Sequence, residues 1–394
     1  MAICKSKSIA IEDLSYDNNF YELQETNIDS DSFINFLANR RSIRNFKDKE
    51  VPQEILQQII SNKDTKTCYY KIIQKDLYEG NEFYIRLTGN IKKEDDFIQK
   101  LLSKLNNQGI TLSHLCNVNQ GILTGADKVS EKHIRRFPNA GFLKGEGIFV
   151  LNKHEVKKIT SKELLKPWFK NSDIYKYFTK TQTQEYLLYL TRDLELSDYK
   201  DIQSHIFKFE KIIKARPKNR GEIQAALKQG KWWVIFAARK GIPFDKAKIV
   251  VPQRSKTNTF GYNEIPWYAS ADVYFITDKD ETVSLKYILA LLNSKIYYLW
   301  FYYKGKKKGE TLELYHRPLS ETPIKKVSYN KQRPFINLVD KILSLTQSEN
   351  YLENPQKQAK VKEYERQIDQ LVYKLYNLTE EEIKIVEDFE KNKL

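Results

Sequence analysis

Short segments between residues 231 and 278 constrain the fold of this chain more than any other feature. They read KWWVIFAAR (231–239), AKIVVPQR (247–254) and DVYFITD (272–278), and they either alternate between apolar and polar residues or are continuously apolar. Segments of this length and pattern are typical of strands in a sheet. The stretches 145–156 and 183–192 have a similar character. We therefore expect a sheet at the centre of the fold.

Longer segments with helical periodicity surround these strands. Residues 94–107 form an amphipathic pattern, residues 202–216 place apolar side chains on one face, and 284–303 are apolar enough for one buried helix. The last 60 or so residues are nearly all helical in pattern. The chain is thus expected to be α+β, with a mixed curved β-sheet, flanking helices and a helical C-terminal segment. The expected divisions are 1–68 of unknown role, 69–325 containing the sheet, and 326–394 containing the C-terminal helices.

One apolar stripe in the C-terminal segment must be buried against another structural element. It is formed by Tyr364, Ile368, Leu371, Val372 and Leu375, which share one face of a helix. Either the chain's own helix at 335–346 or a partner's catalytic domain would bury it.

Positive charge is concentrated in one part of the sequence. Residues 201–260 contain 14 Lys and Arg against 4 Asp and Glu, in a chain whose net charge is +15. Lys and Arg neutralise phosphates and release counterions, which drives sequence-independent binding to nucleic acid. The aromatic residues between them can pack in the core or contact bases. This pattern favours a nucleic-acid partner, and the alternative is the ordinary basic surface of a Lys-rich protein.

Several residues are candidates for direct contact with DNA. We expect phosphate contacts from the first basic cluster and at least one contact to a base edge from residues at strand ends or in loops. The first group comprises Lys214, Arg216, Lys218 and Arg220, and the second comprises Arg239, Lys240, Arg254, Lys256 and Asn258. Thr124, Lys128, Lys306 and Lys307 complete the predicted DNA-binding set.

Catalytic motifs are absent from the sequence. The 3 cysteines and 5 histidines show no metal-ligand spacing, and no phosphate-binding glycine loop or nucleophile elbow occurs. The Asn/Asp/Ser-Pro-Pro-Tyr/Phe motif of amino-methyltransferases is missing as well. No apolar run is long enough for a membrane helix, and no signal peptide is evident. We expect a cytoplasmic protein with no catalytic residue, metal site or cofactor of its own.

One N-terminal segment suggests a different class of protein. The sequence FLANRRSIRNFKDKEVPQEILQQII (36–60) resembles the N-terminal signature of nitroreductase flavoproteins. That resemblance implies that Arg40, Arg41 and Arg44 would grip a flavin phosphate. A flavin-dependent reductase is therefore one alternative, and an RNA-binding or scaffold protein that uses the same basic surface is another.

Four segments in order resemble the TaqI-like C-terminal specificity domain of adenine-specific DNA methyltransferases and restriction–modification enzymes. They are LSHLCNVNQGILTGADKV (112–129), LLKPWFKNSDIYKYF with YLLYLTR, the stretch from HIFKFEKIIKAR to SADVYFIT, and LKYILALLNSKIYYLWFYYKGKKKGETLELYHRPLSETPI. The tail ERQIDQLVYKLYNLTEEEIKIVE is similar to the closing segment of those proteins, so that the resemblance runs from about residue 69 to 394.

The resemblance implies that this chain recognises duplex DNA and lacks the chemistry of methylation. In the family, the catalytic and cofactor-binding motifs precede this module, and the residues that precede it here are too few for a methyltransferase domain. The implied role is the specificity half of an adenine-specific restriction–modification methyltransferase. A methyltransferase or methyltransferase–nuclease subunit would then be the partner, and S-adenosylmethionine would bind to that subunit.

Overall fold

The computed structural model describes residues 78–79, 84–85, 93–219, 221–348 and 350–393. The chain divides into two compact units, Met1–Lys100 and Leu101–Leu394. In the first, β1 (Tyr78–Glu79) pairs antiparallel with β2 (Tyr84–Ile85). Helix α3 (Lys93–Gln108) confirms the helix expected at 94–107. The helices expected within 30–63 and the arginines of the flavin-like motif lie outside the described residues.

The largest sheet of the second unit has five strands, most of them antiparallel. In spatial order these are β4 (Cys116–Gln120), β13 (Val273–Asp278), β9 (Lys248–Pro252), β11 (Gly261–Asn263) and β7 (Tyr177–Phe178). Strands β13 and β9 are central, and Phe275 lies opposite Val250, with both side chains fully buried. Continuous apolar sequence is expected where both faces of a sheet are covered. The strands expected at 247–254 and 272–278 are therefore confirmed.

The remaining strands form smaller sheets. The four-stranded sheet has the order β12 (Tyr268–Ala269), β6 (Leu165–Phe169), β8 (Glu185–Leu188) and β5 (Val150–Asn152). The three-stranded antiparallel sheet has the order β10 (Arg254–Ser255), β15 (Thr311–Glu313) and β14 (Lys306–Lys308). A short pair joins β16 (Pro323–Ile324) to β3 (Ile110–Thr111). The α+β class is confirmed, and the strands are shared among several sheets.

Residues 284–303 form two helices where the sequence pattern indicates one. Helix α10 (Leu285–Leu292) ends at Asn293, and α11 (Lys295–Tyr303) begins after Ser294. Asn293 donates from Nδ2 to the Phe260 carbonyl (2.8 Å) and accepts at Oδ1 from the Phe260 N–H (3.1 Å). Asn258 donates to the carbonyls of Leu292 (2.7 Å) and Ser294 (2.9 Å). The bond to Leu292 satisfies a carbonyl that the end of α10 would otherwise leave unpaired.

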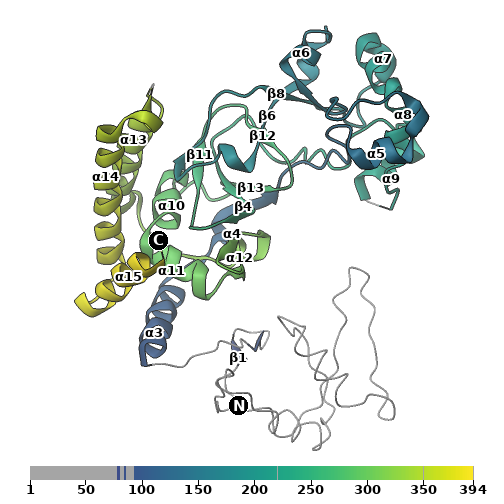
Figure 1. The fold of residues 1–394 in the computed structure, drawn as a ribbon. Coiled ribbons are helices and arrows are strands. Elements are labelled where there is room, and N and C mark those ends of the chain that lie inside the picture. The colour runs from purple at the N-terminus through teal and green to yellow at the C-terminus, as the bar shows by residue number, and fades with distance from the viewer. Residues whose placement is uncertain (1–77, 80–83, 86–92, 220, 349, 394) are drawn as a thin grey trace, which may run out of the picture. The chain divides into compact units, whose positions relative to one another are not determined.

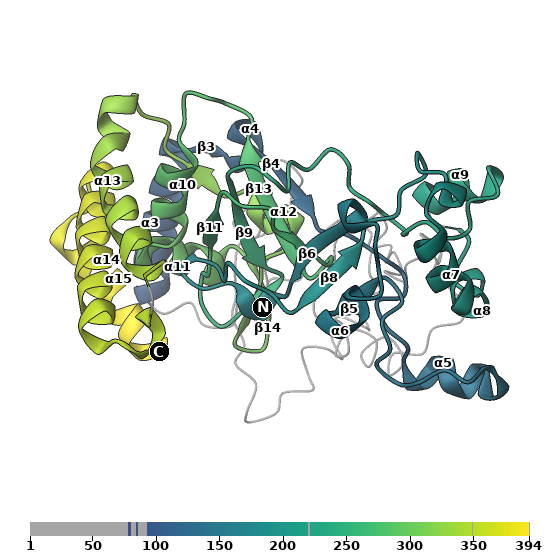
Figure 2. The same cartoon turned by 90° about the horizontal axis from the view of Figure 1, so that it is seen from above.

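Three long helices follow, and Figures 1 and 2 show the first two side by side, next to α10, and the third beside α11. They are α13 (Tyr329–Thr346), α14 (Pro355–Leu375), with Pro at its first position, and α15 (Glu380–Lys393). Helix α14 packs on α13, α10 and α11, and α15 packs on α11. Ile368 and Val372 of the predicted stripe are fully buried there. The chain's own helices therefore cover the centre of the stripe.

A buried carboxyl at this helix junction predicts a pH effect. Asp369 accepts a hydrogen bond from the Lys295 N–H (3.0 Å), and burial raises its pKa to about 7, although Lys176 and Lys295 oppose the shift. Glu390 adds to the rise. In the unfolded chain this carboxyl has a pKa of about 3.9. Ionising Asp369 therefore costs folding free energy, a cost that is absent below about pH 4 and complete above the folded pKa.

We expect the stability of Asp369→Asn relative to the wild type to increase as pH rises from about 4 to 7, the range between the unfolded and folded pKa values. The amide keeps an acceptor for the Lys295 N–H and never ionises. Urea unfolding of both proteins at each pH measures the difference in free energy of unfolding. A difference that stays constant across this pH range would contradict the shift.

The remaining helices are short. At the end of the unit away from α13 and α14 lie α5, α7, α8 and α9, as Figure 2 shows. Their bounds are α5 (Glu131–Arg136), α7 (Lys200–Lys208), α8 (Glu210–Lys214) and α9 (Gly221–Lys228). The helix expected at 202–216 is thus interrupted at Phe209, which is fully buried. Three more short helices occur, α4 (Leu112–Leu115), α6 (Lys153–Val156) and α12 (His316–Ser320).

Candidate nucleic-acid interface

Arg216, predicted to contact phosphate, lies in the interior. Its side chain donates from Nε to the Ile213 carbonyl (3.0 Å), from Nη1 to Thr124 (2.7 Å), and from Nη2 to Trp232 (2.9 Å) and Val234 (2.8 Å). The residue is 7% exposed, and burial lowers its pKa to about 9, so that it stays charged at neutral pH. All three guanidinium nitrogens thus serve backbone carbonyls. The prediction that Arg216 faces a phosphate does not fit this geometry.

The same contacts explain why residues 231–239 are not a strand. The carbonyls of Trp232 and Val234 point at the Arg216 guanidinium, and the N–H of Ile235 donates to Leu190. Within this segment only Ala237 makes a β-bridge, with Leu123. The strand expected here is therefore wrong, although most of its apolar side chains are buried as a strand's would be.

Thr124 is also internal. Its hydroxyl donates to the Asp127 carboxylate and accepts from the Ala126 N–H (3.2 Å), which closes a turn. Gly125 has φ +83, and a Cβ there would lie 2.8 Å from the Phe236 ring. Glycine is required because of both the left-handed backbone and the close approach. Thr124 thus shapes a turn and is only 4% exposed.

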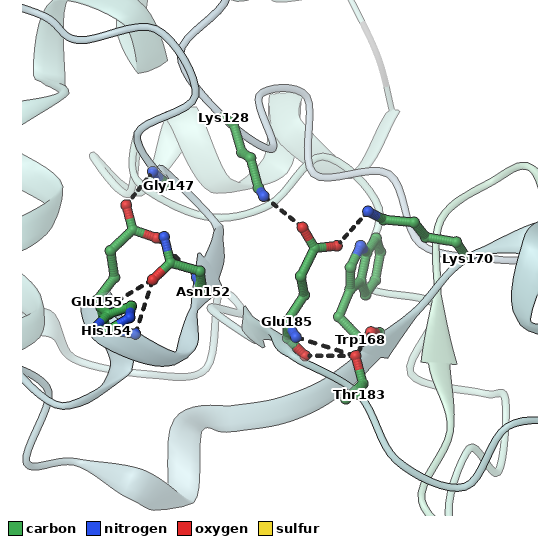
Figure 3. Close-up of polar contacts among 9 residues, drawn as sticks. All are labelled: Lys128, Gly147, Asn152, His154, Glu155, Trp168, Lys170, Thr183 and Glu185. Carbon is green, nitrogen blue, oxygen red and sulfur yellow. Dashed lines mark hydrogen bonds and ion pairs between the residues drawn. The ribbon is translucent and has the colours of Figure 1, made fainter.

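Lys128 belongs to a cluster on the four-stranded sheet. Figure 3 shows Lys128 and Lys170 reaching Glu185 from opposite sides, and the Lys170 contact is 2.9 Å. The Glu185 side chain is 15% exposed. Burial acts to raise its pKa, but hydrogen bonds from the two lysines outweigh this effect and lower it. One carboxylate therefore holds two cations, which leaves the cluster with an excess of positive charge.

Local hydrogen bonds fix the strands that carry this cluster. The Thr183 hydroxyl donates to the Trp168 carbonyl (2.6 Å) and accepts from the Glu185 N–H (3.1 Å). Glu155 accepts from the N–H groups of Gly147 (2.7 Å) and Asn152 (2.8 Å), as Figure 3 shows. The carboxylate that holds both lysines thus lies at the start of a well-braced strand, β8.

Arg254, Lys256, Lys306 and Lys307 gather on or beside the three-stranded sheet. In its register Glu313 lies opposite Arg254 on one side and Lys306 on the other. Glu313 Oε1 lies 3.2 Å from Arg254 Nε, and Oε2 lies 3.2 Å from Lys306 Nζ. The Lys306 ammonium also lies 5.1 Å from the ring centroid of Tyr315. We call Arg254, Lys256, Lys306, Lys307, Glu313 and Tyr315 the three-strand site.

Charges in the three-strand site are arranged as in the Lys128 cluster. The Glu313 side chain is 6% exposed, whereas those of Arg254 and Lys306 are 49% and 52% exposed. Burial acts to raise the pKa of Glu313, but hydrogen bonds from Tyr315, Lys306 and Arg254 outweigh it and lower the pKa. A buried anion thus orients two exposed cations. Lys256 and Lys307 are exposed.

Arg239 and Lys240 follow the apolar segment that ends at Ala238. Arg239 has φ 55, an uncommon backbone conformation for a residue with a side chain, and its Nε lies 3.4 Å from the Gly121 carbonyl. Lys240 is exposed and pairs with Asp193. Asn258, by contrast, is 3% exposed and bonded within the helix break, so that its amide nitrogen faces no ligand.

Lys214 and Lys218 lie apart from the three-strand site, in or after α8. Lys214 pairs with Glu210 (2.5 Å), and its ammonium lies 5.0 Å from the Trp232 ring centroid. Lys218 is exposed, and Arg220 lies outside the described residues. The predicted residues therefore fall into separate exposed groups and three internal positions, Thr124, Arg216 and Asn258.

Sequence reasoning missed Lys170, Glu185, Glu313 and Tyr315. Their positions depend on cross-strand pairing between distant segments, such as residues 254 and 313. The only available signal was the alternation in EYLLYLT and TLELY, which places Glu185 and Glu313 next to buried leucines. Such a position favours a carboxylate that is partly buried and needs cationic partners.

Among the residues that the structure describes, no group of three or more His, Cys, Asp or Glu side chains is arranged to hold a metal ion. Within the same residues, none of the helices has the length and apolar character needed to cross a membrane.

Comparison with known proteins agrees with the resemblance seen in the sequence. The chain is 32% identical over 127 residues to the Type II methyltransferase M.HincII of Haemophilus influenzae, covering 29% of this chain and 25% of that protein. It is 32% identical over 112 residues to the Type II methyltransferase M.HindII of the same species, covering 25% and 22%. The matched segments thus span about a quarter of the length of these relatives.

Solved structures show a more distant likeness. The Type IIL restriction-modification enzyme MmeI, solved in complex with DNA, matches with a TM-score of 0.49 and 14% identity, over 70% of this chain and 35% of that one. The type IIG restriction endonuclease BpuSI matches with a TM-score of 0.38 and 12% identity, over 72% and 33%.

A specific family matches the centre of the chain. The match covers residues 166–324. These include β8, most of β6, the Lys- and Arg-rich residues 201–260 and the three-strand site. The matching model is that of the TaqI-like C-terminal specificity domain, to which this part of the chain is similar.

Proposed function

We propose that this chain is a duplex DNA recognition module that provides sequence specificity to an adenine-specific DNA methyltransferase. The observation that carries the proposal is the match of residues 166–324 to a specificity domain. The three-strand site lies within the matched residues and presents two exposed cations, Arg254 and Lys306, on one buried carboxylate, with Lys256 and Lys307 also exposed. Cations of this kind bind phosphates and base edges.

The proposal assigns the methylation chemistry to a partner. The relatives that match over part of their length are methyltransferases. In our proposal a methyltransferase or methyltransferase–nuclease subunit binds S-adenosylmethionine and flips the target adenine, while this chain holds the duplex.

Salt dependence of DNA binding tests the proposal. We expect the full chain to bind duplex DNA with an affinity that falls as salt rises, because each neutralised phosphate releases counterions. Replacing Lys256 and Lys307 together with Ala should weaken binding to all sequences and reduce the log–log salt slope by about 0.9 for each phosphate that the variant no longer neutralises. Fluorescence anisotropy with labelled duplexes measures both quantities.

Two further pairs locate the contact surface. Lys214→Ala with Lys218→Ala removes the same charge from the α8 region, and Lys362→Ala with Lys384→Ala removes it from exposed positions on α14 and α15. The last pair should leave the slope nearly unchanged. Equal slopes for all three pairs would mean that only net charge matters, and absence of duplex binding by the wild type would refute the proposed function.

A further inference from the structure

The guanidinium of Arg254 is held along one edge and open along the other. Arg254 donates from Nε toward Glu313 Oε1 (3.2 Å) and from Nη2 to the Tyr315 hydroxyl (2.9 Å). Nε and Nη2 together form one of the two edges through which a guanidinium makes paired hydrogen bonds. The other edge, formed by Nη1 and the second N–H of Nη2, has two parallel donors, and the Arg254 side chain is 49% exposed.

Tyr315 and Glu313 form a directional clamp on this guanidinium. The Tyr315 hydroxyl accepts from Arg254 and donates to Glu313 Oε1 (3.0 Å), so that it bridges the cation and the anion. Glu313 is anchored in β15 and nearly buried, and Lys306 balances its second oxygen. Each partner of Arg254 is thus itself held in place. Such bracing reduces the side-chain entropy that Arg254 would lose on binding.

The open edge suits a ligand with two acceptors in one plane. In the major groove, guanine presents N7 and O6 in this arrangement, and a bidentate arginine contact there gives about 1–3 kcal/mol of discrimination. A phosphate also accepts two hydrogen bonds. However, a flexible lysine binds phosphate too, so that phosphate binding does not need a clamp that fixes the plane of the donors. The neighbouring Lys306 and Lys307 provide such point charges.

We infer that Arg254 reads a guanine base edge, with Glu313 and Tyr315 as its positioning residues. This inference rests on the proposed function and names the chemistry that the three-strand site recognises. Asn258, another of the predicted base-edge readers, is bonded to the helix break, which excludes it. Glu313 acts through Arg254 and also limits the net charge of the site, which restrains binding to unrelated sequences.

Selection of duplexes from a randomised pool by the full wild-type chain, followed by sequencing, tests the inference. Arg254→Lys keeps the positive charge and removes the fork. We expect this variant to lose its preference for guanine at one position, by about 5- to 150-fold, and to keep the preferences at other positions. In the wild type, 7-deazaguanine at that position, which lacks the N7 acceptor, should weaken binding, and it should leave Arg254→Lys unaffected.

Variants of the clamp separate positioning from simple structural support. Tyr315→Phe keeps the ring beside Lys306, and Glu313→Gln keeps the size of the side chain. Both should weaken the preference at the same guanine, and Glu313→Gln should also raise affinity for unrelated duplexes, because the site becomes more positive by one charge. A purely structural role would lower affinity for every sequence alike.

Lys256→Ala is the matched control, since it removes one exposed charge near Arg254 without touching the clamp. It should lower affinity uniformly and leave the selected sequence unchanged. If the wild type selects a sequence and Arg254→Lys selects the same one with the same preference, the inference is overturned while the proposed function stands. If the wild type binds duplexes with no preference, the proposed function itself fails.

Discussion

Replacing Arg216 with Ala is expected to destabilise the chain by about 3–5 kcal/mol. The substitution empties space beside Phe149 and Phe236, whose ring centroids lie 5.2 and 4.7 Å from the guanidinium carbon. It also removes the guanidinium donors from the carbonyls of Thr124, Trp232 and Val234, and a buried polar group without a partner costs about 1–3 kcal/mol. Chemical denaturation followed by tryptophan fluorescence measures the effect.

Lys214→Ala is the matched control for Arg216→Ala, because it removes a cation from an exposed position two residues away. It should change the free energy of unfolding by no more than about 0.5 kcal/mol. Arg216→Met adds a second test, since it restores volume but no donors, and it should recover only part of the stability. If Arg216→Ala is as stable as the wild type but binds DNA more weakly, Arg216 contacts DNA and its internal structural role is refuted.

Deleting residues 355–394 is expected to abolish cooperative folding of the second unit. The deleted helices bury six large apolar or aromatic side chains, Val361, Ile368, Val372, Tyr373, Tyr376 and Val386. At about 1.5–3 kcal/mol each, their burial contributes about 9–18 kcal/mol as an upper estimate. That is comparable with the entire stability of a domain, about 5–15 kcal/mol. Thermal melting of the truncated chain measures the result.

Point variants on α14 show whether the deletion acts through packing. Ile368→Ala should cost about 2–5 kcal/mol, whereas Gln370→Ala, at an exposed position of the same helix, should be nearly neutral. A truncated chain that melts cooperatively but no longer assembles with a methyltransferase would assign α14 and α15 to docking instead.

Elements with strong periodicity could be predicted from the sequence, and their junctions could not. Strands β9 and β13 and helix α3 follow directly from apolar pattern and length. The interruption at Asn293 and Ser294 depends on Asn258, which is 35 residues away from Asn293 in the chain, and no local pattern reveals that partner. Tertiary hydrogen bonds outweigh local propensity at such points.

The proposed contact surface was predictable in part for a related reason. Basic composition drew attention to residues 201–260, but a count of charges does not distinguish Arg216, which is buried, from Lys214, which is exposed. In the interior, the Arg216 guanidinium donates to four carbonyls, and the Asn258 amide bonds to the helix break. Both depend on neighbours that only the fold brings together. The Arg254–Glu313 pairing has the same origin, in strand register.

The paired asparagines at the helix break have a consequence for how specificity can change over time. The excursion from Arg254 to Thr257 is pinned at one end by sheet pairing and at the other by the Asn258 amide. Lys256, between these pins, is exposed, and exposed substitutions usually shift stability by only about 0.5 kcal/mol. The backbone of this segment is therefore held independently of the side chain at position 256. Under the proposed function, that side chain can change and alter DNA binding while the surrounding scaffold stays the same.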